Sequence, residues 1–419
     1  MNTVTIGFLA LLAASFLLRE WLAWRQIRHV RAGREQVPDA FRDRVPLAAH
    51  QRAADYTVAR TRTAMLELGW ETVLLLAWTL GGGLALLDQA WQAAGWSTLW
   101  TGVAVILSAQ LVSALLELPF SIYETFFVEQ RFGFNRTTPA TFIADMVKQG
   151  LLMLAFGVPL VAVILWLMEV AGPLWWLWAW LVWMGFTLLM TWAYPTFIAP
   201  LFNRFTPLTD AGLRERIERL LKRCGFRASG IFVMDGSKRS GHGNAYFTGL
   251  GRNKRIVFFD TLLETLEPDE IEAVLAHELG HFRRKHVQKR MFVMALMSLG
   301  GLALLGWLIQ QPAFFTGLGV PEPSTYMGLL LFMFVTPVIG TFIQPLAAAF
   351  SRRHEFEADE FAAQETDADH LVRALVKLYR ENASTLTPDP LYSAFHDSHP
   401  PAPVRVGHLS SRMQTAGAH

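Results

Sequence analysis

An apolar stretch beyond the middle of the chain carries the pattern H-E-x-x-H, with His277, Glu278 and His281 at its fixed positions. Pro268, followed by acidic residues, predicts that a helix begins shortly before this pattern. Side chains four residues apart on a helix share one face, so the two histidines can direct their imidazoles at one metal ion. Glu278 lies beside them and can act as a general base on water without binding the metal. The pattern therefore predicts zinc-dependent hydrolysis of an amide bond.

Two histidines alone make an incomplete site, because a catalytic zinc takes three protein ligands and keeps one open position. A later acidic segment carries Glu355 and Asp359 four residues apart, on one face of a predicted helix. We predict that Glu355 is the third ligand. Asp359 would accept the N–H of a ligand histidine and fix the tautomer of that ring. The alternative is a solvated acidic helix face, which the H-E-x-x-H pattern disfavours.

A proline-rich segment near the C-terminus holds a further histidine and an arginine. His399 precedes Pro400 and Pro401, which restrict the chain to a rigid turn, and Arg405 follows them closely. Both side chains could donate hydrogen bonds to the oxyanion of a tetrahedral intermediate, so both are candidate catalytic residues. The alternative is a loop histidine that takes no part in catalysis.

Two runs rich in aromatic and aliphatic residues, 244–248 and 255–259, flank a turn that contains Gly249. This pattern predicts a β-hairpin directly ahead of the helix that carries the histidines. An extended peptide could add to such a hairpin as an edge strand, which makes Asn244 and Ala245 candidate substrate-binding residues. The sequence equally allows a hairpin that only braces the helix.

The composition is that of a membrane protein with a sizeable polar part. Of the 419 residues 52% are hydrophobic and 17% are charged, and the mean hydropathy is +0.29. Soluble domains carry about a quarter charged residues. The formal net charge of +2 gives no indication of nucleic-acid binding. Cys224 is the single cysteine, which excludes intramolecular disulfides and zinc sites built from several cysteines.

Seven stretches are long and apolar enough to cross a bilayer, which takes about 20 residues. The first has no basic segment before it, so we interpret it as a retained span rather than a secretory signal. Arginine is concentrated between residues 19 and 62, whereas the connections on the other side have no basic residue. The positive-inside rule then places the N-terminus outside and the C-terminus in the cytoplasm, and we expect the protein in the cell inner membrane. The stretches lie near residues 3–23, 66–88, 98–119, 148–171, 174–197, 291–311 and 325–350.

These observations together predict an all-α polytopic membrane protein with seven transmembrane helices and a cytoplasmic α+β catalytic domain of the zincin type. The polar part should include an amphipathic helix over 209–224 and a short strand over 230–235. Four segments are expected: five membrane helices with their loops in 1–206, a catalytic subdomain in 207–290, the last two membrane helices in 291–350, and a part completing the zinc site in 351–419.

Taken together, these segments resemble the type I CAAX prenyl proteases, a family of integral-membrane zinc metalloproteases. H-E-x-x-H alone is common to many zinc peptidases, but its combination with the other segments is much more specific. The resemblance spans most of the chain in the family's order. The matching segments are Phe132-Gly133-Phe134-Asn135, residues 195–205, 244–249, 277–281, 352–359 and 399–405.

The resemblance implies one zinc ion per chain, with His277, His281 and Glu355 as ligands and Glu278 as the base. It also implies that the histidine and arginine of the C-terminal segment assist at the scissile carbonyl, and that the hairpin strand holds the substrate. Members of the family remove C-terminal tripeptides from prenylated proteins. The partners implied are therefore a peptide or lipidated-protein substrate and the lipid bilayer, with no nucleic acid, and no oligomer is implied.

Three other functions remain open at the level of sequence. A more general metallopeptidase that acts on misfolded or membrane-associated chains fits the same residues. A transporter with a structural zinc would need four protein ligands, and only three can be assigned. A scaffold that has kept the motif without activity is disfavoured by the intact Glu278.

Overall fold

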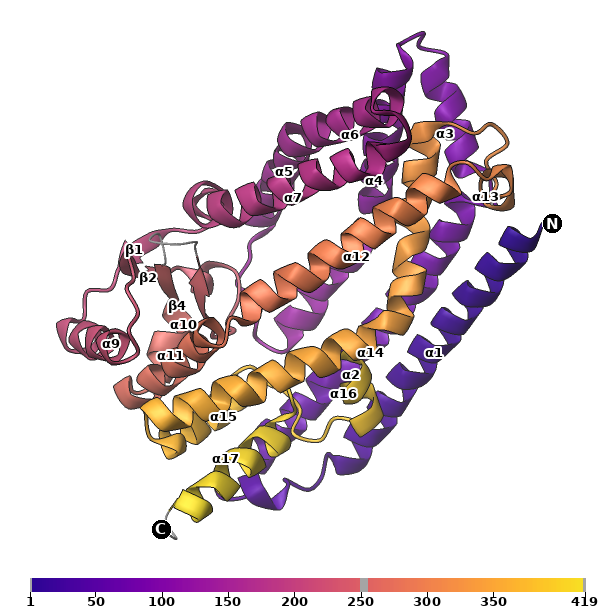
Figure 1. Ribbon diagram of the computed structural model, residues 1–419. Helices are drawn as coiled ribbons and strands as arrows, with labels where there is room; N and C mark the ends of the chain where they lie inside the picture. The colour runs from indigo at the N-terminus through magenta and orange to yellow at the C-terminus, as the bar shows by residue number, and fades with distance from the viewer. Residues whose placement is uncertain (1, 249–254, 417–419) are drawn as a thin grey trace.

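The computed structural model describes residues 2–248 and 255–416 of the chain. Within these residues the protein is mostly helical, with one small sheet at one end of the long helices (Figure 1). Gly249 of the predicted hairpin turn lies outside the described residues.

Six helical segments are long and apolar enough to cross a membrane, or seven if the bent pair α2–α3 counts as one span. Each of the seven predicted stretches coincides with one of these segments, although 148–171 and 291–311 extend past the helix ends at Val170 and Leu308. The pair is bent by 51°, and Gly82 at the break has a φ of 79°. The segments are α1 (Thr3–Gly33), α2 (Leu47–Trp78) with α3 (Gly83–Gln92), α4 (Thr98–Tyr123) with η2 (Glu124–Glu129), α5 (Pro139–Leu152) with η3 (Met153–Gly157) and α6 (Val158–Val170), η4 (Gly172–Leu174) with α7 (Trp175–Ala193), η5 (Tyr194–Ile198) and α8 (Ala199–Phe202), α12 (His286–Leu308) and α14 (Thr325–Glu365).

The sheet has four strands in the order β1-β2-β4-β3. β2 and β4 are parallel, and the two outer pairs are antiparallel. β2 and the hairpin of β3 and β4 confirm the predicted strands, whereas the three-residue β1 was not predicted. β3 is an edge strand of this sheet. The strands are β1 (Phe205–Pro207), β2 (Gly230–Met234), β3 (Ala245–Thr248) and β4 (Arg255–Phe259).

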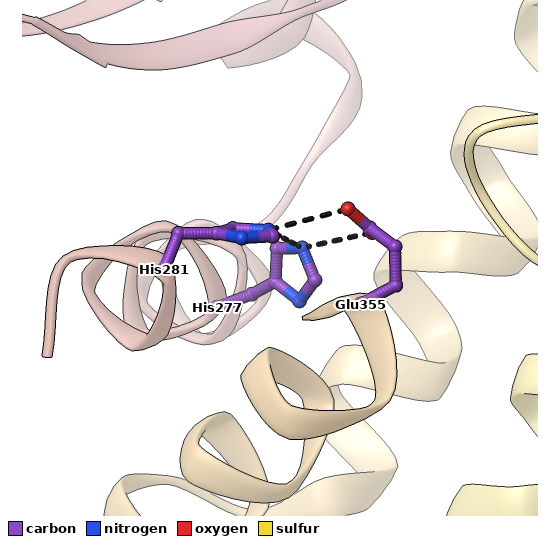
Figure 2. Close-up of side chains that lie close together, drawn as sticks. All are labelled: His277, His281 and Glu355. Atoms are coloured by element: carbon purple, nitrogen blue, oxygen red, sulfur yellow. Dashed lines mark hydrogen bonds and ion pairs between the residues drawn. The ribbon is translucent and has the colours of Figure 1, made fainter. Parts of the chain in front are cut away.

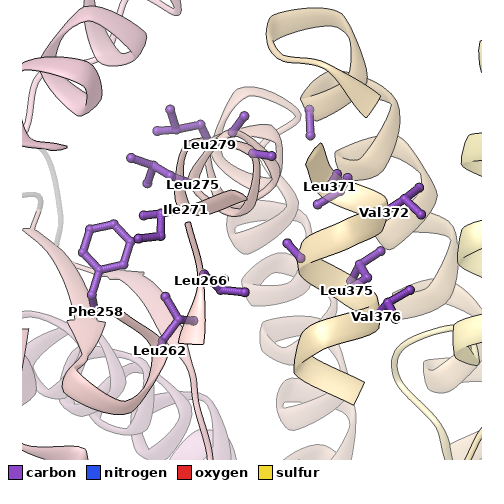
Figure 3. Close-up of a cluster of buried hydrophobic side chains, with 14 of the residues drawn as sticks. Phe258, Leu262, Leu266, Ile271, Leu275, Leu279, Leu371, Val372, Leu375 and Val376 are labelled. Carbon is purple, nitrogen blue, oxygen red and sulfur yellow. The ribbon is translucent and has the colours of Figure 1, made fainter. Parts of the chain in front are cut away.

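The polar part has a single hydrophobic core that joins segments far apart in the sequence. α11, which carries Ile271, Leu275 and Leu279, lies between the sheet residue Phe258 on one side and Leu371 and Leu375 of α15 on the other (Figure 3). The segments predicted over 207–290 and 351–419 therefore pack as one body. The helices of the polar part are α9 (Ala211–Arg223), α10 (Asp260–Thr265), α11 (Pro268–Arg283), α15 (Ala368–Glu381), α16 (Pro390–His396) and α17 (Ala402–Ala416). Three further short helices complete the described residues: η1 (Asp39–Phe41), η6 (Gly236–Lys238) and α13 (Pro312–Gly317).

α11 and α14 approach each other closely at Gly280. A Cβ atom at this position would lie 2.9 Å from Ala358 Cα and 3.2 Å from Phe361 Cβ. Glycine inside a helix costs about 1 kcal/mol relative to alanine, and this crossing explains why it is tolerated. α14 has 41 residues and is about 60 Å long. It runs from an apolar segment to Glu355 and Asp359, which the crossing brings next to the two histidines.

Candidate metal centre

The start of α11 is fixed by its own side chains. Pro268 occupies the first turn, as predicted, and Glu267 and Glu270 form a capping box. The Glu267 N–H donates to Glu270 Oε2 at 2.8 Å, and Lys377 of α15 donates to the same oxygen at 2.8 Å. The capping box therefore sets where the helix begins and also ties it to α15.

Three donor side chains converge between α11 and α14 (Figure 2). His277 Nε2 lies 3.2 Å from His281 Nε2, and the two oxygens of Glu355 lie 3.4 Å from the first ring and 3.3 Å from the second. Ligand atoms around a tetrahedral zinc, with bonds of about 2.0–2.1 Å, are separated by about 3.3 Å. Glu355 Oε2 is buried and lies 2.8 Å from His399 Nδ1. One zinc ion thus fits this donor set.

Behind His277 lies a buried ion pair. His277 Nδ1 is 2.8 Å from Asp359 Oδ1, and Arg405 donates to the two oxygens of Asp359 at 2.5 and 2.9 Å. Burial lowers the pKa of His277, but its hydrogen bonds to Asp359 and Glu355 outweigh that effect and raise it to about 9. With Nε2 directed at a metal, Nδ1–H donates to Asp359. This contact fixes the tautomer and makes the ring a stronger ligand.

Behind His281 lies a different set of groups. His281 Nδ1 is 3.0 Å from His286 Nδ1, and His286 Nε2 is 3.1 Å from Glu357 Oε2. The ring of His286 is buried and stacks on His354, with centroids 4.0 Å apart. If His281 directs Nε2 at a metal, its Nδ1–H donates a hydrogen bond to His286 Nδ1, and the Nε2–H of His286 then donates to Glu357.

The sequence analysis assigned no role to His286 or Glu357. The only signal available was a third histidine five residues after His281, a spacing that would leave it on another face of a continuous helix. In the structure the helix ends first, and Lys285 has a φ of 57°. This left-handed residue turns the chain so that His286, the first residue of α12, faces back toward His281.

The other predicted residues are placed differently around the cluster. Glu278 is half-buried on α11 and makes no hydrogen bond or ion pair with another side chain within residues 2–248 and 255–416. His399 Nδ1 lies 2.8 Å from Glu355 Oε2, and its side chain is 63% exposed. Arg405 is buried and its guanidinium is bound to Asp359. The predicted His, Glu, Asp and Arg residues are thus gathered at one place.

Asn244 and Ala245 lie at the start of β3, which packs against α11. The Phe259 N–H donates to the carbonyl of Asn244 at 3.0 Å, so this residue forms part of the ladder with β4. Pairs alternate along an antiparallel ladder, and the register pairs Ala245 with Phe258. The main-chain groups of Ala245 and Phe247 therefore face away from β4, toward the free edge of the sheet.

This arrangement combines three side chains that could hold one metal ion, a carboxylate on Glu278, which follows His277 in the chain, and the edge strand β3. Those are the parts that metal-assisted hydrolysis of a peptide requires. The exposed ring of His399 adds a group able to donate a hydrogen bond at the rim of the site.

Two families match consecutive parts of the chain: "CAAX prenyl protease N-terminal, five membrane helices" matches residues 26–204 and "Peptidase family M48" matches residues 207–413. The chain is 41% identical over 308 residues to a CAAX prenyl protease 1 homolog of Dictyostelium discoideum, covering 72% of this chain and 71% of that protein. The Caenorhabditis elegans homolog is 32% identical over 430 residues, covering 95% and 96%. The crystal structure of S. mikatae Ste24p matches with a TM-score of 0.88 and 30% identity, covering 98% of this chain and 99% of that one.

Proposed function

The chain belongs to the CAAX prenyl protease family of M48 metallopeptidases and is a membrane zinc metalloprotease, and on this premise we propose that it removes C-terminal tripeptides from prenylated proteins at a zinc ion bound by His277, His281 and Glu355. The observation that carries the proposal is the convergence of the three side chains. The two Nε2 atoms lie 3.2 Å apart, and each lies 3.3–3.4 Å from one of the two oxygens of Glu355, close to the separation of about 3.3 Å between ligand atoms around a tetrahedral zinc. One zinc ion per chain is expected.

When bound, zinc polarises the scissile carbonyl and makes water a better nucleophile. Glu278 is the general base: it takes a proton from the attacking water and passes it to the leaving amine. His399 donates a hydrogen bond to the carbonyl oxygen as negative charge develops there. Arg405 is bound to Asp359, so it assists at the carbonyl chiefly by holding Asp359 against His277.

The substrate is held by strand addition to β3. The main-chain groups of Ala245 and Phe247 that face away from β4 would pair with an extended peptide. The Ala245 N–H now donates to Asn244 Oδ1 at 2.8 Å, so the peptide would replace this contact. Asn244 is the residue at which this edge begins. Affinity from main-chain hydrogen bonds implies loose side-chain preference, so the lipid on the substrate is expected to supply much of the selectivity.

The orientation in the membrane follows from charge. We expect the N-terminus outside and the C-terminus in the cytoplasm, because ten arginines lie between residues 19 and 62 at the connection of α1 and α2. The sheet and the metal centre would then lie on the cytoplasmic side of the cell inner membrane. The membrane part would comprise 1–206 and 291–350, and the catalytic part 207–290 and 351–419.

Peptide hydrolysis by the full-length protein in detergent tests the proposal. A farnesylated peptide ending in a CAAX sequence is compared with the same peptide carrying a free cysteine, and the products are identified by mass spectrometry. We expect release of the C-terminal tripeptide from the farnesylated peptide, loss of release with a chelator, and its return with zinc. Glu278→Gln should lower turnover by about 10²–10⁴-fold with zinc still bound, because the amide cannot accept the proton.

The outcomes separate the parts of the proposal. Equal cleavage of both peptides would reject prenyl selectivity and leave the peptidase assignment intact. Near-normal turnover of Glu278→Gln would reject Glu278 as the base.

A further inference from the structure

The arginines around the connection of α1 and α2 fall into two groups. Arg28, Arg31 and Arg62 have no carboxylate or carbonyl oxygen within bonding distance of their guanidinium groups among the described residues. Each of the other seven arginines has such an oxygen near its guanidinium group. Those pairs are Arg19 with Glu71, Arg25 with Asp389, Arg34 with Asp55, Arg42 with Asp39, Arg44 with Asp369, Arg52 with the carbonyl of Phe132, and Arg60 with Glu124.

The three unpaired arginines lie around one groove between α1 and α2, with a volume of about 660 Å³. The spacing along the helices explains the grouping, because the lining residues recur every three or four positions and therefore share one face of each helix. Apolar side chains complete the lining, and two of them are strongly exposed, Trp24 at 51% and Leu66 at 69%. The groove, called here the α1–α2 groove, is lined by Trp24, Ile27, Arg28, Arg31, Arg62, Met65 and Leu66.

The α1–α2 groove lies where apolar sequence gives way to charged sequence. Its α1 residues follow the apolar stretch near 3–23, and its α2 residues immediately precede the stretch near 66–88. Both helices thus place the groove at the depth of lipid headgroups, where Trp24 is the residue type favoured at membrane interfaces. The guanidinium of Arg28 also lies over the ring of Trp24, 5.4 Å from its centroid, within the roughly 6 Å of a cation–π contact.

Arg31 has a longer-range attraction to Asp55, but none of the three arginines forms an ion pair within the described residues. The groove therefore keeps a positive charge that is complementary to an anion. A phosphate group matches the planar donor fork of arginine. The exposed apolar side chains at the same place fit a hydrocarbon chain, which a soluble phosphate lacks. Only an amphiphile with a negative headgroup can pair with the arginines and also cover the exposed apolar side chains.

We propose that the α1–α2 groove binds an anionic phospholipid. Arg28, Arg31 and Arg62 hold its phosphate, and Met65 and Leu66 pack against the upper part of an acyl chain. The lipid joins the end of α1 to the beginning of α2. This site is separate from the metal centre and does not depend on the proposed substrate.

Native mass spectrometry of the full-length protein in detergent tests this site. The protein is mixed with equal amounts of dioleoyl-phosphatidylglycerol and dioleoyl-phosphatidylcholine, which share their acyl chains and differ in charge. We expect one phosphatidylglycerol to bind in preference. Changing Arg28, Arg31 and Arg62 to Gln together should lower its occupancy on the order of 100-fold, about fivefold for each arginine near an anionic headgroup. Arg62→Gln alone, an exposed substitution compatible with folding, should give the fivefold step.

The matched control removes the same charge elsewhere, by changing the exposed Arg42, Arg219 and Arg227 to Gln. It should retain the bound phosphatidylglycerol. An unchanged phosphatidylglycerol signal in the groove variants would overturn the proposal, and so would an equal loss in the control, which would indicate attraction by net charge alone. Displacement by glycerol 3-phosphate at the concentration of the lipid would reject a phospholipid in favour of a soluble phosphate.

Discussion

His277 and His281 contribute equivalent ring nitrogens to the candidate metal centre, but the groups behind the two rings differ. His277 is backed by Asp359, which is fully buried and bound by the buried Arg405. His281 is backed by His286, whose contact continues to Glu357, a side chain that is 27% exposed. Removing one partner of a buried ion pair leaves an uncompensated charge, whereas water can replace an exposed partner. The position of the His277 ring should therefore depend more strongly on its support, Asp359, than the position of the His281 ring depends on its support, His286 with Glu357.

The largest loss of zinc binding is expected for a change at Glu355, because both histidine rings contact this residue. Glu355 contacts both Nε2 atoms, so Glu355→Ala should lose zinc outright, because two histidines bind it far more weakly than three ligands. Elemental analysis of the purified variant measures this. Stoichiometric zinc would move the third ligand elsewhere, with Asp359 the first residue to examine.

Asp359→Asn tests the buried support. The amide cannot neutralise Arg405, and breaking a buried pair costs about 3–5 kcal/mol. Zinc affinity should fall toward the upper end of the roughly 10–100-fold range typical of groups that orient a ligand. Competition with a chromogenic chelator gives the affinity, and thermal unfolding gives the stability. An affinity within a factor of about two of wild type would show that His277 does not need this carboxylate.

Gly280→Ala tests the crossing of α11 and α14, which brings Asp359 and Glu357 close to the two histidines. The added Cβ would lie 2.9 Å from Ala358 Cα, so α14 must shift, with an expected loss of about 1–3 kcal/mol in stability and weaker zinc binding. Gly407→Ala is the matched control, because nothing lies within 4 Å of that Cβ in α17. It should be neutral or stabilise by up to about 1 kcal/mol. A stable Gly280→Ala variant with normal zinc affinity would contradict the close packing.

Glu357→Gln tests the exposed support. The glutamine oxygen can still accept from His286, and Glu357 is partly open to water, so zinc affinity should fall by about tenfold at most. The comparison with Asp359→Asn under identical conditions is decisive. A larger loss for Glu357→Gln would reverse the ranking of the two supports.

Ala245→Pro should have the smallest effect on the metal centre. It removes an N–H that faces the free edge and leaves the ladder with β4 intact. The Michaelis constant should rise several-fold, by about 1 kcal/mol for one hydrogen bond, with zinc content unchanged. Peptides N-methylated near the scissile bond should lose affinity in parallel. If every N-methylated peptide is cleaved normally, the strand only braces α11.

The two supports also differ in how far they could be predicted from the sequence. Asp359 stands one turn from Glu355 on the same helix, so periodicity alone placed it beside a ligand. His286 reaches His281 only because Lys285 adopts a left-handed conformation, which is unusual for a residue other than glycine. No spacing rule anticipates that turn. Its partner Glu357 was therefore left without a role.

The fold shows the same limit. Apolar runs located the membrane helices, and the alternation of residues located β2, β3 and β4, because these signals are local. β1 has only three residues and exists through its pairing with β2. Likewise, the sequence shows ten arginines between residues 19 and 62, but only the folded chain distinguishes the seven with internal partners from the three around the α1–α2 groove.

α14 carries Glu355 at the far end of a helix that starts in an apolar segment, and α12 begins at His286, a few residues after His281. A soluble fragment cut from the polar part of the chain would therefore lack either a ligand or the support of one. Conversely, a zinc ion bound by His281 and Glu355 would join α14 to α11, which α12 follows directly in the chain. The metal is then a crosslink between these helices as well as a reagent, and its removal should loosen the membrane part of the protein.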